Sequence, residues 1–89
     1  MISEQKLLEI EKRCKDSTSG PWKAFIEGRD HDSGGHFIMT GEGDNRGEDL
    51  EIDGARMEDY DFIANAKQDI PILISEVRRL RELLGGYSK

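Results

Sequence analysis

Two histidines and an aspartate lie together in one short segment near the middle of the chain. The segment reads His31-Asp32-Ser33-Gly34-Gly35-His36. Imidazole nitrogens and carboxylate oxygens are common ligands of divalent metal ions, and a hairpin could bring these three side chains together. Their spacing matches no established metal motif, however, and polar glycine-rich segments are typical of exposed turns. We therefore expect an exposed turn, with a metal site at His31, Asp32 and His36 as the alternative.

A single thiol, Cys14, is the other side chain with inherent reactivity. It has no partner for an internal disulfide, and a catalytic cysteine needs a base within hydrogen-bond reach, which neither histidine is placed to supply. Its helical spacing from Leu7 and Ile10 predicts a thiol that faces a core. We predict no catalytic residue and no cofactor, and the absence of paired cysteines favours a reducing, cytoplasmic location.

The elements around these residues are a helix and several short strands. Ser3 followed by Glu4 is typical of a helix start, and the apolar spacing that follows predicts a helix over about residues 3–16. Alternating apolar residues between glycine-rich turns predict strands at 22–27, 36–40 and 50–53. Short connections of this kind favour a three-stranded antiparallel meander.

The strongest pattern is an apolar stripe in the last third of the chain, at alternating steps of three and four residues. Its members are Ile63, Ala66, Ile70, Leu73, Val77, Leu80 and Leu84. This is the period of a helix face. Proline is welcome only in the first turn of a helix, so Asp69-Ile70-Pro71 indicates a second start. We expect an α+β fold whose C-terminal part, about 59–84, is one kinked helix or two consecutive helices packed on one face of the sheet and ended by Gly85-Gly86.

The stripe has a second potential use, which is to bind another chain. A wide apolar helix face in a small domain can cover the sheet, pair with its counterpart in a second copy, or do both. The residues that we assign to interaction are Ile70, Leu73, Val77, Leu80 and Leu84. The partner is then an unidentified protein or a second copy, which would make a homodimer through the C-terminal helix.

Charge and length limit the remaining possibilities. The chain has 89 residues and a net charge of −6, and residues 27–61 hold twelve carboxylates against three arginines. Such a region repels phosphate backbones, which argues against direct nucleic-acid binding. The length favours a single domain over 1–89. No apolar run is long enough to span a membrane, so we expect no membrane association.

Several segments together resemble a layout found in small phage and prophage proteins. Gly20-Pro21-Trp22 follows the first predicted helix, and the segment from Asp61 to Pro71 reads DFIANAKQDIP. In these features the chain is similar to Ead-like early phage proteins and uncharacterised bacterial relatives. The resemblance implies a shared α+β scaffold and a phage or bacterial origin, and it implies no activity.

The sequence therefore predicts a non-enzymatic protein-interaction module of the phage or prophage type. One alternative is an acidic inhibitor that occupies the basic site of a nucleic-acid-binding protein, as the charge of the middle region allows. A second alternative is a small metal-dependent enzyme built around His31, Asp32 and His36.

Overall fold

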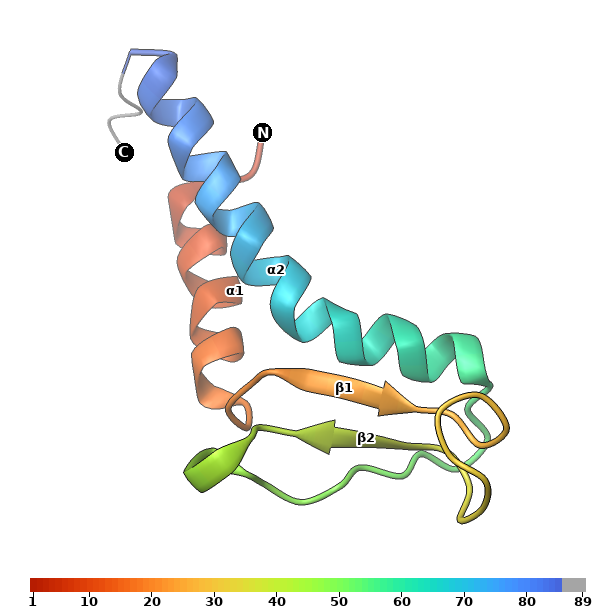
Figure 1. Cartoon of the computed structure of the whole chain (residues 1–89). Coiled ribbons are helices and arrows are strands. Elements are labelled where there is room, and N and C mark those ends of the chain that lie inside the picture. The colour runs from red at the N-terminus through yellow and green to blue at the C-terminus, as the bar shows by residue number, and fades with distance from the viewer. Residues whose placement is uncertain (86–89) are drawn as a thin grey trace. The chain divides into compact units, whose positions relative to one another are not determined.

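The computed structural model describes residues 1–85. Its elements follow in the order α1 (Glu4–Asp16), β1 (Trp22–Phe25), β2 (Phe37–Thr40), a short 3-10 helix η1 (Gly43–Asn45) and α2 (Met57–Leu83), as Figure 1 shows. They form two compact units. The hairpin unit is Thr18–Gln68, and the helical unit combines Met1–Ser17 with the chain from Asp69 onward. The predicted α+β class is confirmed, whereas a single domain over residues 1–89 stays a prediction.

The sheet of the hairpin unit has two antiparallel strands. Ala24 is paired with Ile38 and Phe25 with Phe37. Side chains alternate between the faces of a sheet, so one face carries Ala24 and Ile38, which are buried. The other face carries the two phenylalanine rings, which stack at a centroid distance of 5.2 Å.

The predicted third strand at residues 50–53 does not form. Leu50 makes one isolated antiparallel bridge with Ile38, through two backbone hydrogen bonds of 2.9 Å. The chain then leaves the sheet, because the next amide that could continue the pairing, that of Ile52, donates to the Tyr60 hydroxyl at 2.9 Å. The meander is therefore two strands and a bridge, although Leu50 and Ile52 still pack against the core.

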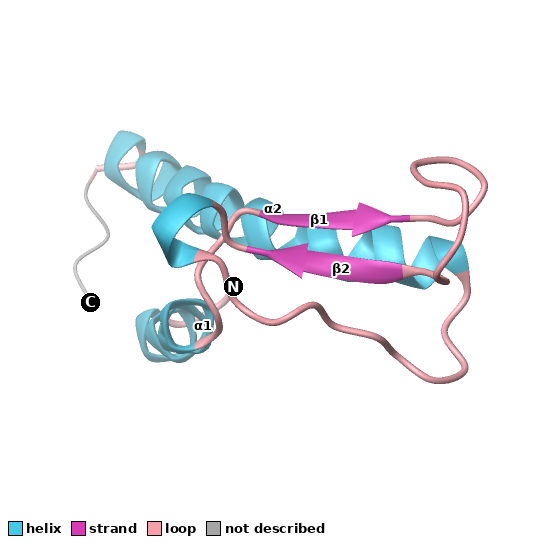
Figure 2. Ribbon diagram, turned by 60° about the horizontal axis from the view of Figure 1, so that its bottom comes forward, coloured by secondary structure: helices cyan, strands magenta, loops and turns pink. Residues whose placement is uncertain are grey.

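The first half of α2 packs on the buried face of this sheet, as predicted. Figure 2 shows the helix running behind both strands. The core between them consists of Ala24, Ile26, Ile38, Tyr60 and Ala64. At the start of the helix, the Asp59 carboxylate accepts a hydrogen bond from the Arg56 backbone N–H at 3.0 Å, which satisfies one of the donors that a helix start leaves free.

Helix α2 continues through Pro71 as one helix, so the alternative of two consecutive helices is wrong. No new helix begins at Asp69, because the residues before it are already helical. At the end of the helix, Gly85 has a φ of +102°, a left-handed conformation that glycine adopts at little cost. Gly86, the other half of the predicted stop, lies outside the described residues.

Helix α1 has the predicted bounds and start. The Ser3 hydroxyl accepts a hydrogen bond from the Lys6 backbone N–H at 3.0 Å, as an N-cap residue does. Leu7 is its buried residue. Within the helical unit, ion pairs to the second half of α2 hold α1 antiparallel to that helix. Among residues 1–85, no helix is long and apolar enough to cross a membrane.

Candidate functional site

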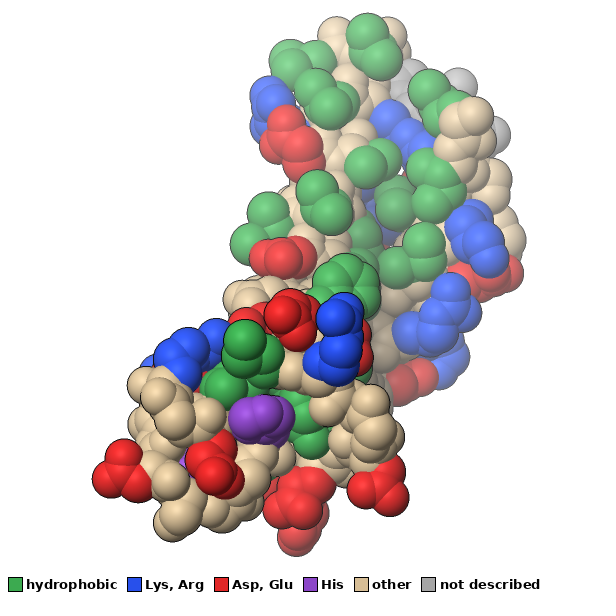
Figure 3. All heavy atoms as spheres, turned by 90° about the vertical axis from the view of Figure 1, so that its right-hand side faces the viewer, with side chains coloured by type: hydrophobic (Ala, Val, Ile, Leu, Met, Phe, Trp, Pro, Cys, Tyr) green, Lys and Arg blue, Asp and Glu red, His purple; other side chains and the backbone are tan. Residues whose placement is uncertain are grey.

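The apolar stripe divides where α2 passes from one unit to the other. In the hairpin unit, Ile63 packs against the core beneath the sheet. In the helical unit, the large side chains of the stripe are exposed: Ile70 by 37%, Leu73 by 61%, Leu80 by 46% and Leu84 by 80%. Figure 3 shows hydrophobic side chains on the surface of the helical unit. The predicted interaction residues therefore form an open apolar surface, with Val77 half-buried among them.

A different side of the same helix segment contacts α1. Ile74 is buried there, and Arg78 donates to the Glu11 carboxylate at 2.9 Å. Arg81 is only 6% exposed and donates to Glu4 at 3.3 Å and to the Ile2 carbonyl. At 100° per residue, these positions lie about a quarter turn from the stripe. Helix α1 thus occupies one side of α2 and leaves the stripe open.

The ion pairs between the two helices change the protonation equilibria of their members. The hydrogen bond from Arg78 lowers the pKa of the Glu11 carboxyl, and the same bond raises the pKa of the Arg78 guanidinium. Arg78 also contacts Glu4 at 3.4 Å, so it bridges two carboxylates that lie two turns apart on the same face of α1. These contacts fix the rotation of α2 relative to α1, and hence which side of α2 is left open.

The structure does not bring His31, Asp32 and His36 together as a metal site. Among residues 1–85, no group of three histidine, cysteine, aspartate or glutamate side chains is placed to hold a metal ion. Asp32 is exposed, while both imidazoles are half-buried and turned to the loop's own backbone. The arrangement gives the metal-dependent enzyme no geometric support.

Each histidine instead helps to order the loop between the strands. The Nδ1 atom of His36 accepts a hydrogen bond from the Glu27 N–H at 3.0 Å, and the ring edge contacts Tyr60 at a centroid distance of 5.6 Å. Nδ1 of His31 lies 2.7 Å from the Ser33 carbonyl oxygen, and its ring packs on Phe37. Nε2 of His31 is buried without a hydrogen-bond partner. These contacts are structural contacts of the loop.

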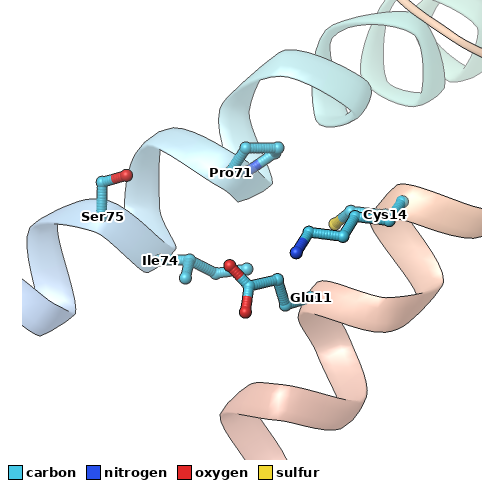
Figure 4. A pocket seen from close by; sticks show the side chains of 6 residues that line it. Glu11, Cys14, Pro71, Ile74 and Ser75 are labelled. Atoms are coloured by element: carbon cyan, nitrogen blue, oxygen red, sulfur yellow. The ribbon is translucent and has the colours of Figure 1, made fainter.

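Cys14 lines a pocket of about 220 Å³ between the two helices of the helical unit (Figure 4). The lining residues are Glu11, Cys14, Lys15, Pro71, Ile74 and Ser75. A histidine that could serve as a base is absent from this lining, and the thiol is half-buried. The sequence predicted a thiol that faces a core, whereas the structure places Cys14 half-buried beside Pro71 and Ile74 and also beside the charged residues Glu11 and Lys15.

Two sets of contacts were not foreseen from the sequence. Arg29 makes a two-bond contact with the Asp61 carboxylate, at 2.9 and 3.0 Å. Arg78 donates to Glu11 at 2.9 Å, and Arg81 donates to Glu4 at 3.3 Å. Each pair is separated by more than thirty residues, and a single sequence carries no signal for such a pairing.

Comparisons with protein-family models, with curated proteins and with solved structures find no match to this chain.

Proposed function

We propose that this chain is a non-enzymatic protein-interaction module of the phage or prophage type, which acts in the cytoplasm and binds through the exposed stripe of α2. The observation that carries the proposal is the exposure of Ile70, Leu73, Leu80 and Leu84 on one helix face. Exposed apolar patches of this kind commonly mark protein-binding surfaces. The phage or prophage assignment rests on the sequence resemblance described above.

The energy available at this surface supports binding. Complete burial of one leucine or isoleucine side chain contributes about 1.5–3 kcal/mol relative to exposure in water. Four half-exposed side chains therefore offer several kcal/mol, which is a useful fraction of the roughly 8 kcal/mol of a micromolar complex. An amphipathic helix that presents residues at steps of three and four is also a common way for one protein to bind another.

The experiment that tests the proposal is site-specific photocrosslinking in cells. A photoreactive amino acid replaces Leu73 in one variant and Ile72 in the control. Ile72 is 64% exposed, compared with 61% for Leu73, but at 100° per residue it lies about a third of a turn round α2 from the centre of the stripe. We expect a discrete crosslinked product from position 73 and none from position 72. Equal products from the two positions, or none from position 73, would contradict the proposal.

The acidic inhibitor remains a second candidate, because carboxylates are exposed along the segment after β2. They are Glu42, Asp44, Glu48, Asp49, Glu51, Asp53 and Glu58. Hydrogen bonds to Thr40 order this segment: its carbonyl accepts from the Gly47 N–H, and its hydroxyl donates to the Glu48 carbonyl. An ordered row of negative charge suits a basic protein surface.

This candidate predicts binding to basic nucleic-acid-binding proteins that weakens steeply with salt. The measurement compares the capture of such proteins by the wild-type chain with capture by a Glu48→Gln, Glu51→Gln variant, from 50 to 500 mM salt. Capture that is unaffected by both salt and the substitutions would exclude the inhibitor.

A further inference from the structure

We infer that the loop between β1 and β2 is sensitive to acid: it is closed while His36 is neutral and opens when that imidazole takes up a proton. The inference goes beyond the proposed function and does not depend on it, because it concerns the hairpin unit alone. Three residues close the loop where its two ends meet. They are Glu27 after β1, and Gly35 and His36 before β2, and we call them the loop base.

Two side chains accept hydrogen bonds across the loop base. The Glu27 N–H donates to Nδ1 of His36 at 3.0 Å, and the Gly35 N–H donates to the Glu27 carboxylate at 2.6 Å. These bonds join residues nine and eight positions apart, so together they close the loop. A ring nitrogen accepts a hydrogen bond only when it carries no proton. The first bond therefore requires a neutral His36 with its proton on Nε2.

Protonation of His36 turns this attraction into a repulsion. The added proton goes to Nδ1, so an N–H of the imidazolium would point at the Glu27 N–H, and neither group can accept. The ring must then turn away, and its edge contact with Tyr60 is lost in the same movement. The bond is thus present at neutral pH and is lost as the pH falls through the titration of the imidazole.

His31 lies in the same loop and has the opposite tautomer. Its Nδ1 lies 2.7 Å from the Ser33 carbonyl oxygen, which can only accept, so Nδ1 carries the proton. This bond survives protonation, because Nδ1 donates in both states. Among residues 1–85, Nε2 of His31 is buried without a hydrogen-bond partner, so a second proton would gain no bond there. Of the two histidine bonds, the one made by His36 is the one that acid removes.

The pH range of the test separates the imidazoles from the other titratable groups around the loop base. Those side chains, in the loop, in the segment after β2 and at the start of α2, are Glu27, Asp30, Asp32, Glu51, Asp53, Tyr60 and Asp61. In water, carboxyl groups titrate near pH 4 and phenols near pH 10, whereas an imidazole titrates near pH 6.5. Hydrogen bonds from Arg29 lower the pKa of the Asp30 and Asp61 carboxyls, which moves both further from the imidazole range.

Amide hydrogen exchange of the full chain, resolved by NMR, gives the first test. We expect the protection factor of the Glu27 amide to fall about fivefold or more between about pH 7.5 and 5.5, which is the effect of losing one typical hydrogen bond. The Leu50 amide, which donates to the Ile38 carbonyl, is the internal control and should keep its protection. Constant protection of Glu27 would overturn the inference, and so would an equal fall at Leu50, which would show unfolding of the whole unit.

Two asparagine variants identify the responsible histidine. In His36→Asn, the side-chain oxygen can take the place of Nδ1 and accepts at every pH, so Glu27 protection should change by less than about twofold over the same range. In the control His31→Asn, the side-chain amide can replace Nδ1–H as the donor to Ser33, and the fall at Glu27 should remain. The opposite pair of results would overturn the assignment to His36.

The tautomers can also be measured without any variant, by ¹⁵N NMR of the two imidazole rings near pH 8. We expect the proton of His36 on Nε2 and that of His31 on Nδ1, as their hydrogen bonds require. This measurement decides the case if an asparagine variant does not fold. A His36 proton on Nδ1 would overturn the inference, because Nδ1 could not then accept from Glu27.

Discussion

At the scale of the residue, a close backbone approach at Gly41 leaves no space for a side chain. Its φ is +70°, and a Cβ there would lie 2.1 Å from the Asn45 carbonyl oxygen. We expect Gly41→Ala to lower the free energy of unfolding by about 3 kcal/mol, as measured by urea denaturation. Gly28→Ala is the matched control, because Gly28 has a φ of +89° but open space around it. Its cost should be about 1 kcal/mol, and equal losses at the two positions would contradict the steric argument.

Arg29 couples the stability of the hairpin unit to pH at the same scale. Its hydrogen bonds lower the pKa of the Asp61 and Asp30 carboxyls. Because both pKa values are lower in the folded chain, this stabilisation is complete above the unfolded value of about 3.9 and is lost as the pH falls through the folded values. Arg29→Gln should therefore cause a small loss of unfolding free energy at pH 7 and almost none at pH 2.

The measurement is urea denaturation at the two pH values. Arg56→Gln serves as the control, since the contact of Arg56 with Asp59 uses only its backbone N–H. If Arg29→Gln and Arg56→Gln had the same effect at pH 7, the contacts of the Arg29 side chain would contribute nothing measurable.

At the scale of the element, Gln68 closes the outer edge of β1. Its side-chain oxygen accepts a hydrogen bond from the Trp22 N–H at 2.7 Å, and its amide nitrogen donates to the Trp22 carbonyl at 3.2 Å. The side chain thus replaces a neighbouring strand at an edge that would otherwise be open to pairing. Gln68→Ala should cost about 1–2 kcal/mol and speed hydrogen exchange at the Trp22 amide several-fold. The control is Gln5→Ala, at an exposed position of α1, which should leave hydrogen exchange at the Trp22 amide unchanged. Unchanged exchange at Trp22 in the Gln68→Ala variant would contradict the role of Gln68.

The elements that the sequence predicted are those with a local cause. Ser3 starts α1 by its own hydrogen bond, and the alternation in residues 22–25 and 37–40 matches the observed strands. The prediction of a third strand was wrong because strand formation there depends on Tyr60, which lies in α2. The Tyr60 hydroxyl accepts the hydrogen bond of the Ile52 N–H. Pro71 was misleading for a similar reason. A proline destabilises the interior of a helix, but the sequence does not show whether the other contacts of that helix outweigh this loss.

The sequence predicted which residues form the candidate surface, but it did not predict how exposed they are. Periodicity assigned Ile70, Leu73 and Leu80 to one helix face, and that face is open. Which side of α2 contacts α1 depends on Arg78 with Glu11, a contact across 67 residues. The spacing of apolar residues along a helix does not show whether the rest of the chain packs on them, because that packing depends on tertiary contacts.

At the scale of the whole molecule, both compact units have small cores. In the helical unit, the buried apolar side chains among the described residues are Leu7 and Ile74. The hairpin unit has five buried core residues. Units of roughly 40–50 residues seldom bury enough apolar surface to offset their conformational entropy without further support. We therefore expect neither unit to be stable when it is cut from the rest of the chain.

The small cores predict that the two units unfold in a single transition, because helix α2 runs through both and couples their unfolding. Ile26→Val in the hairpin unit and Ile74→Val in the helical unit each remove one buried methylene, at a cost of about 0.5–1.5 kcal/mol. We expect either change to lower the same single melting transition by a few degrees, with equal calorimetric and van't Hoff enthalpies per cooperative unit. Two separate transitions, each moved by only one of the isoleucine variants, would show that the units fold independently and that α2 joins them without coupling them.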